Sequence, residues 1–276
     1  MKWIWKPSTH LKINQLALQK MSKKFQKFIN IYQHLFQLGV IAPDKIFADT
    51  SNHYYNITPN SNGYHSGTVV KKIEKEIMLI YQMMNSYDTV IHHPRCADYL
   101  KSIMDTPLKA VIFELGVISH YVADLHQPFH TDGKYHFPYE EVPHKIFEAD
   151  VRKNFALLSI SLSKRRYRIK NITQFFYNQI DKIHPFYDKL VDNYFLNPQK
   201  VKPDRFTKSI SITEFCIGIA ADNVANVWFL FEDKLDNYKS QIQYLLLHQK
   251  INSHLSPENK YSLKVYPSGT VSIRKN

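Results

Sequence analysis

Residues 107–130 read PLKAVIFELGVISHYVADLHQPFH, and this stretch decides the fold. A proline at its first position and a long apolar run after it predict a buried helix from about Pro107 to His126. His120 and Asp124 are four residues apart, so a helix places both side chains on one face. A carboxylate in so apolar a helix is costly unless a cation or a hydrogen-bond donor partners it. The stretch therefore predicts a buried helix that carries a polar site.

A second pair with the same spacing follows a short loop. Pro128 ends the first helix, so His130 falls just beyond its C-terminal end. Pro143 then opens another predicted helix, in which His144 and Glu148 are four residues apart. Imidazole and carboxylate are the ligands that zinc accepts where thiolates are absent. Two such pairs flanking a loop histidine predict a metal site, with the intervening histidines at 126 and 136 outside its ligand shell.

The rest of the chain is mostly helical by its pattern. Only 7 glycines and 13 prolines interrupt 276 residues, which favours long helices over a β fold with many turns. Residues 39–67 are dense in turn-forming residues and predict a loop, with Gly39 ending the helix before it. Further helices are expected at about residues 10–38, 68–86, 143–163, 172–194 and 212–246. The expected fold class is therefore all-α.

The C-terminal tail has a different pattern. Tyr261–Tyr266 and Thr270–Arg274 alternate in character on either side of a Pro-Ser-Gly turn, which predicts a β-hairpin. We therefore expect one helical domain over residues 1–247 and a short appendage with a β-hairpin over residues 248–276.

Composition limits the class of protein. The net charge of +12 either attracts anions, such as nucleic acid, anionic lipid or phosphate esters, or serves solubility alone. No run of about 18 apolar residues is present, so no membrane-spanning helix is expected. The two cysteines, Cys96 and Cys216, are expected to be small buried residues rather than a disulfide. Without a Cys-x-x-Cys motif, a thiolate zinc site is not expected.

The N-terminal residues bear on localisation. Only three apolar residues stand between Lys2 and Lys6, whereas a secretory signal needs about 7–15. We therefore expect a cytoplasmic protein, with secretion as the alternative if the N-terminus is processed.

The stretch from His120 to His130 resembles the signature of the zinc-dependent phospholipase C and P1-type nuclease superfamily, in its bacterial phospholipase C form. That signature reads His-Tyr-x-Gly/Thr-Asp and continues to Pro-x-His. Ala123 stands where the signature prefers Gly or Thr, and Thr131-Asp132-Gly133 replaces the residues that usually follow. These departures lie beside the predicted ligands, so they bear on the choice of substrate.

The resemblance extends upstream of this helix. Leu38–Asp44, which reads LGVIAPD, is similar to the Gly-x-x-x-Pro-Asp segment of the family. His53–Tyr55 is similar to its later His-aromatic-aromatic motif. On this resemblance, Asp44 and His53 are metal ligands.

The nuclease branch offers a competing pair of ligands. Phe47–Asp49 resembles a triplet of that branch, and His65 follows Asp49 at a suitable spacing. The proline before Asp44 and the two aromatic residues after His53 favour the first pair.

The N-terminal segment resembles the family as well. Trp5 is followed by His10, as the family's N-terminal Trp is followed by a ligand His at the start of the first helix. The resemblance therefore implies that His10 is a ligand. In secreted members the N-terminal Trp itself binds zinc, so a ligand role for Trp5 depends on removal of Met1–Ile4.

The resemblance implies a multi-zinc hydrolase with two to three ions. One ion would be held by His53, His120, Asp124 and Asp44, a second by His130, His144 and Glu148, and a third by His10 and the bridging Asp124. Asp44 would also accept a proton from the nucleophile. The implied reaction is hydrolysis of a phosphodiester, with a phospholipid headgroup favoured as the substrate over nucleic acid. A transient contact with a membrane surface and no obligate protein partner are expected.

Two alternatives remain open from the sequence. One is a P1-type nuclease or nucleotidase that acts on single-stranded nucleic acid, which the basic composition would suit. The other is a zinc-binding module that keeps the ligands but has no catalytic activity.

Overall fold

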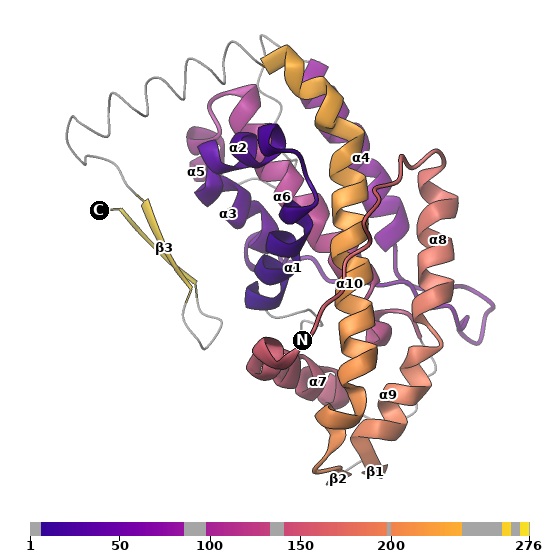
Figure 1. The fold of residues 1–276 in the computed structure, drawn as a ribbon. Helices are drawn as coiled ribbons and strands as arrows, with labels where there is room; N and C mark the ends of the chain where they lie inside the picture. Colours follow the sequence, from indigo (N-terminus) through magenta and orange to yellow (C-terminus); the bar gives the residue numbers. More distant parts are fainter. Residues whose placement is uncertain are drawn as a thin grey trace.

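The computed structural model describes residues 7–85, 98–132, 141–197, 200–238, 261–265 and 271–275. Within these ranges the chain is mainly helical, which confirms the predicted fold class (Figure 1). The α-helices are α1 (Pro7–Gln19), α2 (Lys23–Ile31), α3 (Gln33–Lys45), α4 (Val69–Asn85), α5 (Asp98–Ile103), α6 (Pro107–Leu125), α7 (Glu141–Asn154), α8 (Ile172–Ile183), α9 (Phe186–Tyr194) and α10 (Arg205–Glu232). Short 3-10 helices are η1 (Pro128–His130), η2 (Phe155–Leu157) and η3 (Asp233–Tyr238).

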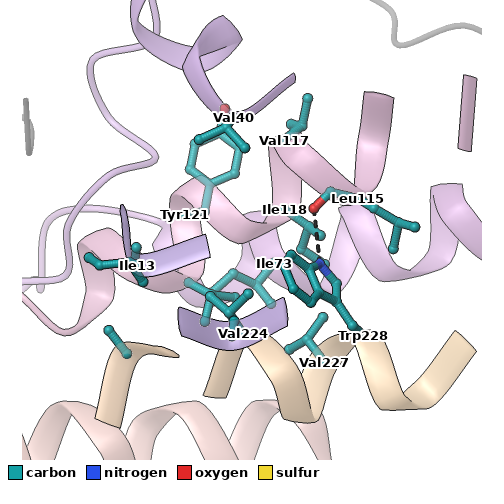
Figure 2. Close-up of a cluster of buried hydrophobic side chains, with 14 of the residues drawn as sticks. Ile13, Val40, Ile73, Leu115, Val117, Ile118, Tyr121, Val224, Val227 and Trp228 are labelled. Atoms are coloured by element: carbon teal, nitrogen blue, oxygen red, sulfur yellow. Dashed lines mark hydrogen bonds between the residues drawn. The ribbon is translucent and has the colours of Figure 1, made fainter. Parts of the chain in front are cut away.

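Helix α6 is the centre of the bundle. Every residue from Ala110 to Leu125 is buried, and α3, α4 and α10 pack around this helix. The Thr106 hydroxyl caps the N-terminal end by accepting a hydrogen bond from the Lys109 N–H group. On the side of α10, the Trp228 indole donates to a backbone carbonyl of α6 inside the hydrophobic core (Figure 2). Because most residues on every side of α6 are apolar, the helix is stable only inside the protein.

Two glycines bring α3 and α6 into close contact. A Cβ atom on Gly39 of α3 would lie 2.0 Å from the Phe113 carbonyl oxygen of α6. A Cβ atom on Gly116 of α6 would lie 2.3 Å from the Phe36 carbonyl oxygen of α3. Only glycine allows the two backbones to approach this closely. This crossing fixes the position of α3 relative to the polar end of α6.

The prediction that Gly39 ends a helix was therefore wrong. This glycine serves the close packing of two helices instead, and α3 continues through Pro43 to Lys45. The predicted helix over residues 10–38 is in fact divided into α1, α2 and the first half of α3, with the Ser22 hydroxyl capping α2. The predicted loop accordingly begins at Ile46, and Asp44 lies on a helix.

The predicted helix over residues 143–163 ends earlier, at Asn154. The following residues 158–170 are extended, and we call this segment the strap; it runs along α10 (Figure 1). Its backbone N–H groups donate to α10 side chains, from Ser159 to Glu214, from Ser163 to Asp222 and from Tyr167 to Asn226. Gly218 makes room for the strap, since a Cβ atom there would lie 2.7 Å from the Ser161 carbonyl oxygen.

The last predicted helices also differ in their bounds. The segment 172–194 is two helices, α8 and α9, which are separated at His184 and Pro185. Helix α10 begins at Arg205, earlier than predicted, and residues 239–246 lie outside the described ranges. The segment Arg205–Leu235 is long and apolar enough to cross a membrane by length and composition, but 72% of its most apolar window is buried inside the protein. This segment is therefore a core helix of the bundle.

Two small pairs of strands complete the described structure. Strand β1 (Phe195–Asn197) pairs with β2 (Lys200–Val201), and β3 (Tyr261–Val265) pairs with β4 (Val271–Lys275), both antiparallel. Leu263 pairs with Ile273, so the two runs predicted to form a hairpin do pair antiparallel. The predicted domain boundary at residue 247 lies outside the described residues and stays a prediction. Cys216 is buried, as expected, and Cys96 lies outside the described ranges, so the absence of a disulfide stays a prediction.

Candidate metal centre

The structure brings together all eight side chains that the sequence predicts as metal ligands. They come from α1 (His10), α3 (Asp44), the loop after it (His53), α6 (His120 and Asp124), η1 (His130) and α7 (His144 and Glu148). Each of these residues is 2% exposed or less. So many ionisable groups are costly to bury unless they partner one another or a cation.

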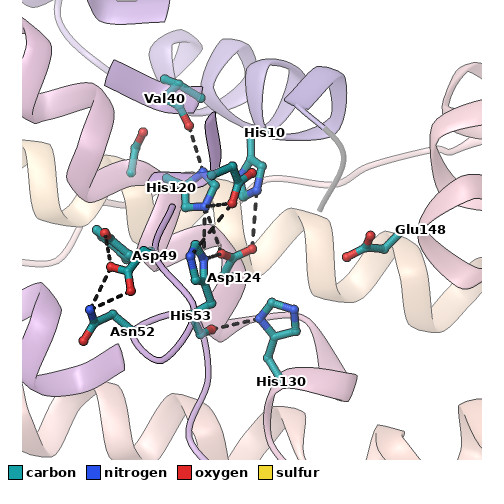
Figure 3. A network of polar contacts seen from close by, with 12 residues as sticks. His10, Val40, Asp49, Asn52, His53, His120, Asp124, His130 and Glu148 are labelled. Atoms are coloured by element: carbon teal, nitrogen blue, oxygen red, sulfur yellow. Dashed lines mark hydrogen bonds and ion pairs between the residues drawn. The ribbon is translucent and has the colours of Figure 1, made fainter. Parts of the chain in front are cut away.

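The first cluster is formed around the Asp124 carboxylate (Figure 3). Its Oδ2 atom lies 2.6 Å from His53 Nδ1 and 3.1 Å from His120 Nε2. The two imidazole nitrogens are 3.2 Å apart, and Asp44 Oδ1 lies 3.4 Å from His120 Nε2. Ligand atoms that are about 2.0–2.1 Å from a tetrahedral zinc ion are about 3.3 Å from one another. Most of these spacings are close to those of ligands around one shared ion.

The second cluster links η1 to α7. His130 Nε2 lies 3.1 Å from His144 Nε2, which is 2.8 Å from Glu148 Oε1. Burial, with a smaller contribution from the neighbouring His144, outweighs the opposing Asp124 charge and lowers the pKa of His130 to about 3. His130 is therefore neutral over the physiological range, which is the form that binds a metal ion. Two imidazole nitrogens and a carboxylate oxygen converge here, as in a three-ligand zinc site.

Backbone carbonyls fix which ring nitrogen faces each cluster. His120 Nδ1 lies 2.8 Å from the Val40 carbonyl oxygen, and His130 Nδ1 lies 2.8 Å from the His53 carbonyl oxygen. A carbonyl can only accept a hydrogen bond, so Nδ1 of both rings carries the proton. The Nε2 lone pairs therefore point into the clusters, as is usual for histidines whose other nitrogen is held by an outer hydrogen bond.

His10 adds a third position beside the first cluster. Its ring stacks on His120 with centroids 3.9 Å apart, and its Nε2 atom lies 3.4 Å from Asp124 Oδ1. Among the described residues, His10 Nδ1 has no hydrogen-bond partner, and His10 Nε2 and Asp124 Oδ1 face each other without forming a hydrogen bond. Buried polar atoms without a partner are costly. The donor set therefore suits a cation between His10 and Asp124.

The electrostatics of the first cluster favour a positive charge. Burial lowers the pKa of His120, but the Asp44 and Asp124 carboxylates outweigh burial and raise the pKa to about 10. Burial raises the pKa of Asp124, but His120 and His10 outweigh it and hold the pKa well below its usual value. The carboxylates therefore stabilise a cation at this place, either a proton on His120 or a metal ion that displaces it.

The competing pair from the nuclease pattern lies outside both clusters. The Asp49 carboxylate accepts hydrogen bonds from the Tyr121 hydroxyl at 2.8 Å and from Asn52 Nδ2 at 2.7 Å (Figure 3). His65 is exposed and stacks on the Tyr55 ring. The geometry thus favours Asp44 and His53 over Asp49 and His65.

The other residues that the sequence singled out are placed as follows. His126 is buried, but its Nδ1 donates to the Val122 carbonyl and its Nε2 accepts from Asn223, so it does not face the clusters. Trp5 and His136 lie outside the described residues.

Sequence reasoning missed the groups that orient the ligands. The carbonyls of Val40 and His53 are backbone atoms, which no residue pattern indicates. The role of Tyr121 was missed as well: its ring lies against His53 and His120, and its hydroxyl is held by Asp49. The adjacency of Tyr121 to His120 in the signature was the one available signal.

This chain is similar to a known protein family in its sequence and to two bacterial toxins in its fold. The model of a family described as zinc dependent phospholipase C matches residues 9–215. Among solved structures, the alpha-toxin of Clostridium perfringens from avian strain SWCP superposes with a TM-score of 0.53 at 14% identity, over 86% of this chain and 65% of that one. The alpha toxin of Clostridium absonum superposes with a TM-score of 0.54 at 15% identity, over 95% of this chain and 70% of that one.

At these identities the structural likeness shows the fold alone, and this chain spans about two thirds of each toxin. A comparison with curated proteins found no match.

Proposed function

The chain belongs to the zinc dependent phospholipase C family, and from this membership we propose that it hydrolyses a phosphodiester of a phospholipid by phospholipase C-type chemistry. The observation that carries the proposal is the convergence of eight buried imidazoles and carboxylates in two adjoining clusters. The family is zinc-dependent, and the family match gives the nuclease alternative no support.

The ligand set divides among the clusters as the spacings suggest. We assign His53, His120 and Asp124 to one zinc ion, and His130, His144 and Glu148 to a second. Asp44 is assigned to the first ion as well, because its Oδ1 atom lies 3.4 Å from His120 Nε2. His10 and the second oxygen of Asp124 are assigned to a third. Bound zinc supplies positive charge against the phosphate oxygens and lowers the pKa of water at the site.

The protein side chains supply orientation and proton transfer. Asp44 Oδ1 lies 3.4 Å from His120 Nε2 and 3.9 Å from His53 Nε2, so this carboxylate faces the first cluster. We assign Asp44 to accept the proton of the attacking water. The Val40 and His53 carbonyls hold the imidazoles of His120 and His130 in place, so the site is ordered before substrate binds.

The substrate class follows from the family, and the surface charge supports it. A net charge of +12 attracts the anionic surface of a membrane, where a phospholipid substrate resides. A transient contact with such a surface is part of the proposal, and a cytoplasmic location stays a prediction.

The test is hydrolysis by the zinc-loaded protein. We expect release of phosphorylated headgroup from phosphatidylcholine vesicles, cleavage of bis-p-nitrophenyl phosphate, and no cleavage of single-stranded DNA. Asp44→Asn is expected to lower the rate about 10²–10⁴-fold, since it removes the proton acceptor. Asp98→Asn is the matched control, because the Asp98 side chain is fully exposed on α5.

Three outcomes would contradict the proposal. DNA cleavage without lipid cleavage would assign the chain to the nuclease alternative. Full zinc loading without hydrolysis of any phosphodiester would make it a zinc-binding module. A normal rate in Asp44→Asn would exclude Asp44 as the proton acceptor.

A further inference from the structure

A cavity lies between the strap, α8 and α10. Its volume is about 620 Å³, within the range of about 300–1,000 Å³ that is typical of small-molecule sites. None of the eight predicted metal ligands lines it. The cavity is therefore a separate candidate site, and its lining indicates what it binds.

Amide side chains form much of the lining. Asn178 and Gln179 come from α8, and Asn223 and Asn226 come from α10. Asn226 Nδ2 donates to Asn223 Oδ1 at 3.1 Å, and Asn223 Nδ2 donates to Gln179 Oε1 at 3.2 Å. An amide both donates and accepts hydrogen bonds, as does a hydroxyl group. Gln179, Asn223 and Asn226 largely bond to one another, whereas Asn178 is exposed, so its amide group is placed to bond a hydroxyl group of a ligand.

The inner wall of the cavity is held in one orientation. His126 Nδ1 donates to the Val122 carbonyl, so its Nε2 must accept the hydrogen bond from Asn223 Nδ2, at 2.8 Å. This contact determines which end of the Asn223 amide is the nitrogen. Asn226 is fixed in turn, because its Oδ1 accepts from the Tyr167 N–H group of the strap. Amides ordered in this way need little rearrangement to bind a ligand.

The charges around the cavity nearly cancel. The Asp222 carboxylate pairs with the Lys20 ammonium and accepts from the Ser163 N–H group at 3.0 Å. The two other charged lining residues, Asp181 and Lys182, have opposite signs. A nearly neutral cavity on a protein of net charge +12 favours an uncharged ligand over a phosphate ester.

Two aromatic side chains supply apolar faces. Phe175 of α8 lines the cavity, and Tyr167 of the strap lines it while remaining 58% exposed. Aromatic rings beside amides are suited to molecules that have C–H faces and hydroxyl edges. We propose that this cavity binds an uncharged polyhydroxylated molecule, of the size of a monosaccharide or disaccharide, and the strap forms one of its walls.

The test is saturation-transfer NMR of the zinc-loaded full chain with glucose and with myo-inositol. We expect saturation transfer to at least one of them, and an increase of about fivefold in Kd for Asn178→Ala, which removes one hydrogen-bonding group. Ile219→Trp fills the cavity from α10 and is expected to abolish the transfer. Asn30→Ala on α2 is the control, because Asn30 is exposed and does not line the cavity.

A second measurement reports on the strap itself. Lys164 and Arg165 are exposed on it, so trypsin cleavage there is expected to slow when the polyol is bound. No transfer to either polyol, or equal transfer in wild type, Asn178→Ala and Ile219→Trp, would overturn the proposal. Binding of choline or inorganic phosphate alone would overturn it too. Neither measurement depends on hydrolysis, so a failed activity assay leaves this test intact.

Discussion

His130 presents a bare ring nitrogen to its cluster because a backbone carbonyl holds the proton on the other nitrogen. The Val40 carbonyl fixes Nδ1 of His120 as a donor in the same way, so the Nε2 atom of His120 faces the first cluster. In each case a backbone carbonyl that is distant in the sequence sets the tautomer of the histidine. The carbonyl and the histidine come from different elements of the fold. At the scale of single residues, metal binding thus depends on a few long-range hydrogen bonds as well as on the ligands.

Removing one ligand of the second cluster should release one ion. Glu148→Gln keeps the shape of the side chain but removes its charge, so we expect the zinc content to fall by about one ion per chain, with the first cluster still loaded. Elemental analysis of the purified protein measures this change. Asp98→Asn should retain the full content, and an unchanged content in Glu148→Gln would contradict the assignment.

A buried carboxyl away from the metal site should make stability depend on pH. Glu114 of α6 is fully buried, and burial raises its pKa well above the usual value, with the nearby Glu76 charge adding to the rise. Folding therefore favours the protonated form. The contribution of Glu114 to the free energy of unfolding should be highest below about pH 4.5. This contribution should fall as the pH rises toward the pKa of Glu114 in the folded state.

Glu114→Gln tests this expectation, because it keeps a neutral hydrogen-bonding side chain at every pH. Denaturant unfolding at pH 4.5 and pH 8 should show a gain in stability for this variant at pH 8 that is small or absent at pH 4.5. Gln33→Ala, an exposed change on α3, should shift both values alike. An equal effect of Glu114→Gln at the two pH values would contradict the raised pKa.

At the scale of elements, the crossing of α3 and α6 joins the fold to the site. Gly39 and Gly116 let the two backbones meet, and the Val40 carbonyl then reaches His120. The same crossing places Asp44 on α3 beside the end of α6 that carries Asp124. A change in this contact should therefore affect stability and metal binding together.

Gly116→Ala tests that coupling. Its Cβ atom would lie 2.3 Å from the Phe36 carbonyl oxygen and 2.7 Å from the Val40 nitrogen, so the helices must separate. We expect a loss of about 3 kcal/mol or more in unfolding free energy, as for severe overpacking, and a lower zinc content. Gln33→Ala, an exposed change on the partner helix α3, should leave both the unfolding free energy and the zinc content near wild type. A stable Gly116→Ala protein with full zinc would show that the crossing does not position the site.

The sequence was informative where the relevant spacing is local. The buried helix of residues 107–126 and the pairs four residues apart within α6 and α7 could be predicted, because a helix fixes such neighbours. The end of α3 and the extended strap could not. A glycine signals a helix end by default, and only the approach of α6 shows that Gly39 serves packing. The strap is held by side chains of α10 that follow it by more than 50 residues.

The ligands of the candidate site also differ in how far local sequence predicts them. His120 with Asp124 and His144 with Glu148 follow from helical spacing, whereas Asp44, His53 and His10 were reached through resemblance to a family. Their approach to α6 is a tertiary contact across 67 or more residues, as between His53 and His120. No local pattern predicts such a contact.

At the scale of the whole molecule, the clusters join helices from both halves of the chain. His10 and Asp44 precede the long loop, whereas His144 and Glu148 follow α6. Bound cations therefore cross-link α1, α3, α6 and α7 through the ligands that these helices carry. Without bound cations, eight buried polar side chains have mainly one another as partners, which makes the folded state less stable.

Removal of zinc should accordingly lower the stability of the whole fold. We expect a chelator to lower the midpoint of thermal unfolding by several degrees, and added zinc to restore it. Scanning calorimetry with and without the chelator measures the shift, and the Asp124→Asn variant should respond less because it has already lost the bridging carboxylate charge. A midpoint that is the same with chelator and with zinc would mean that no cation is bound to the fold.

The most direct measurement of the central claim is anomalous diffraction at the zinc absorption edge from crystals of the zinc-loaded protein. We predict one peak about 2.0–2.2 Å from the ligand atoms of His130, His144 and Glu148, and another at the same distance from His53, His120 and Asp124. The absence of any peak among these side chains would contradict the assignment of a zinc centre.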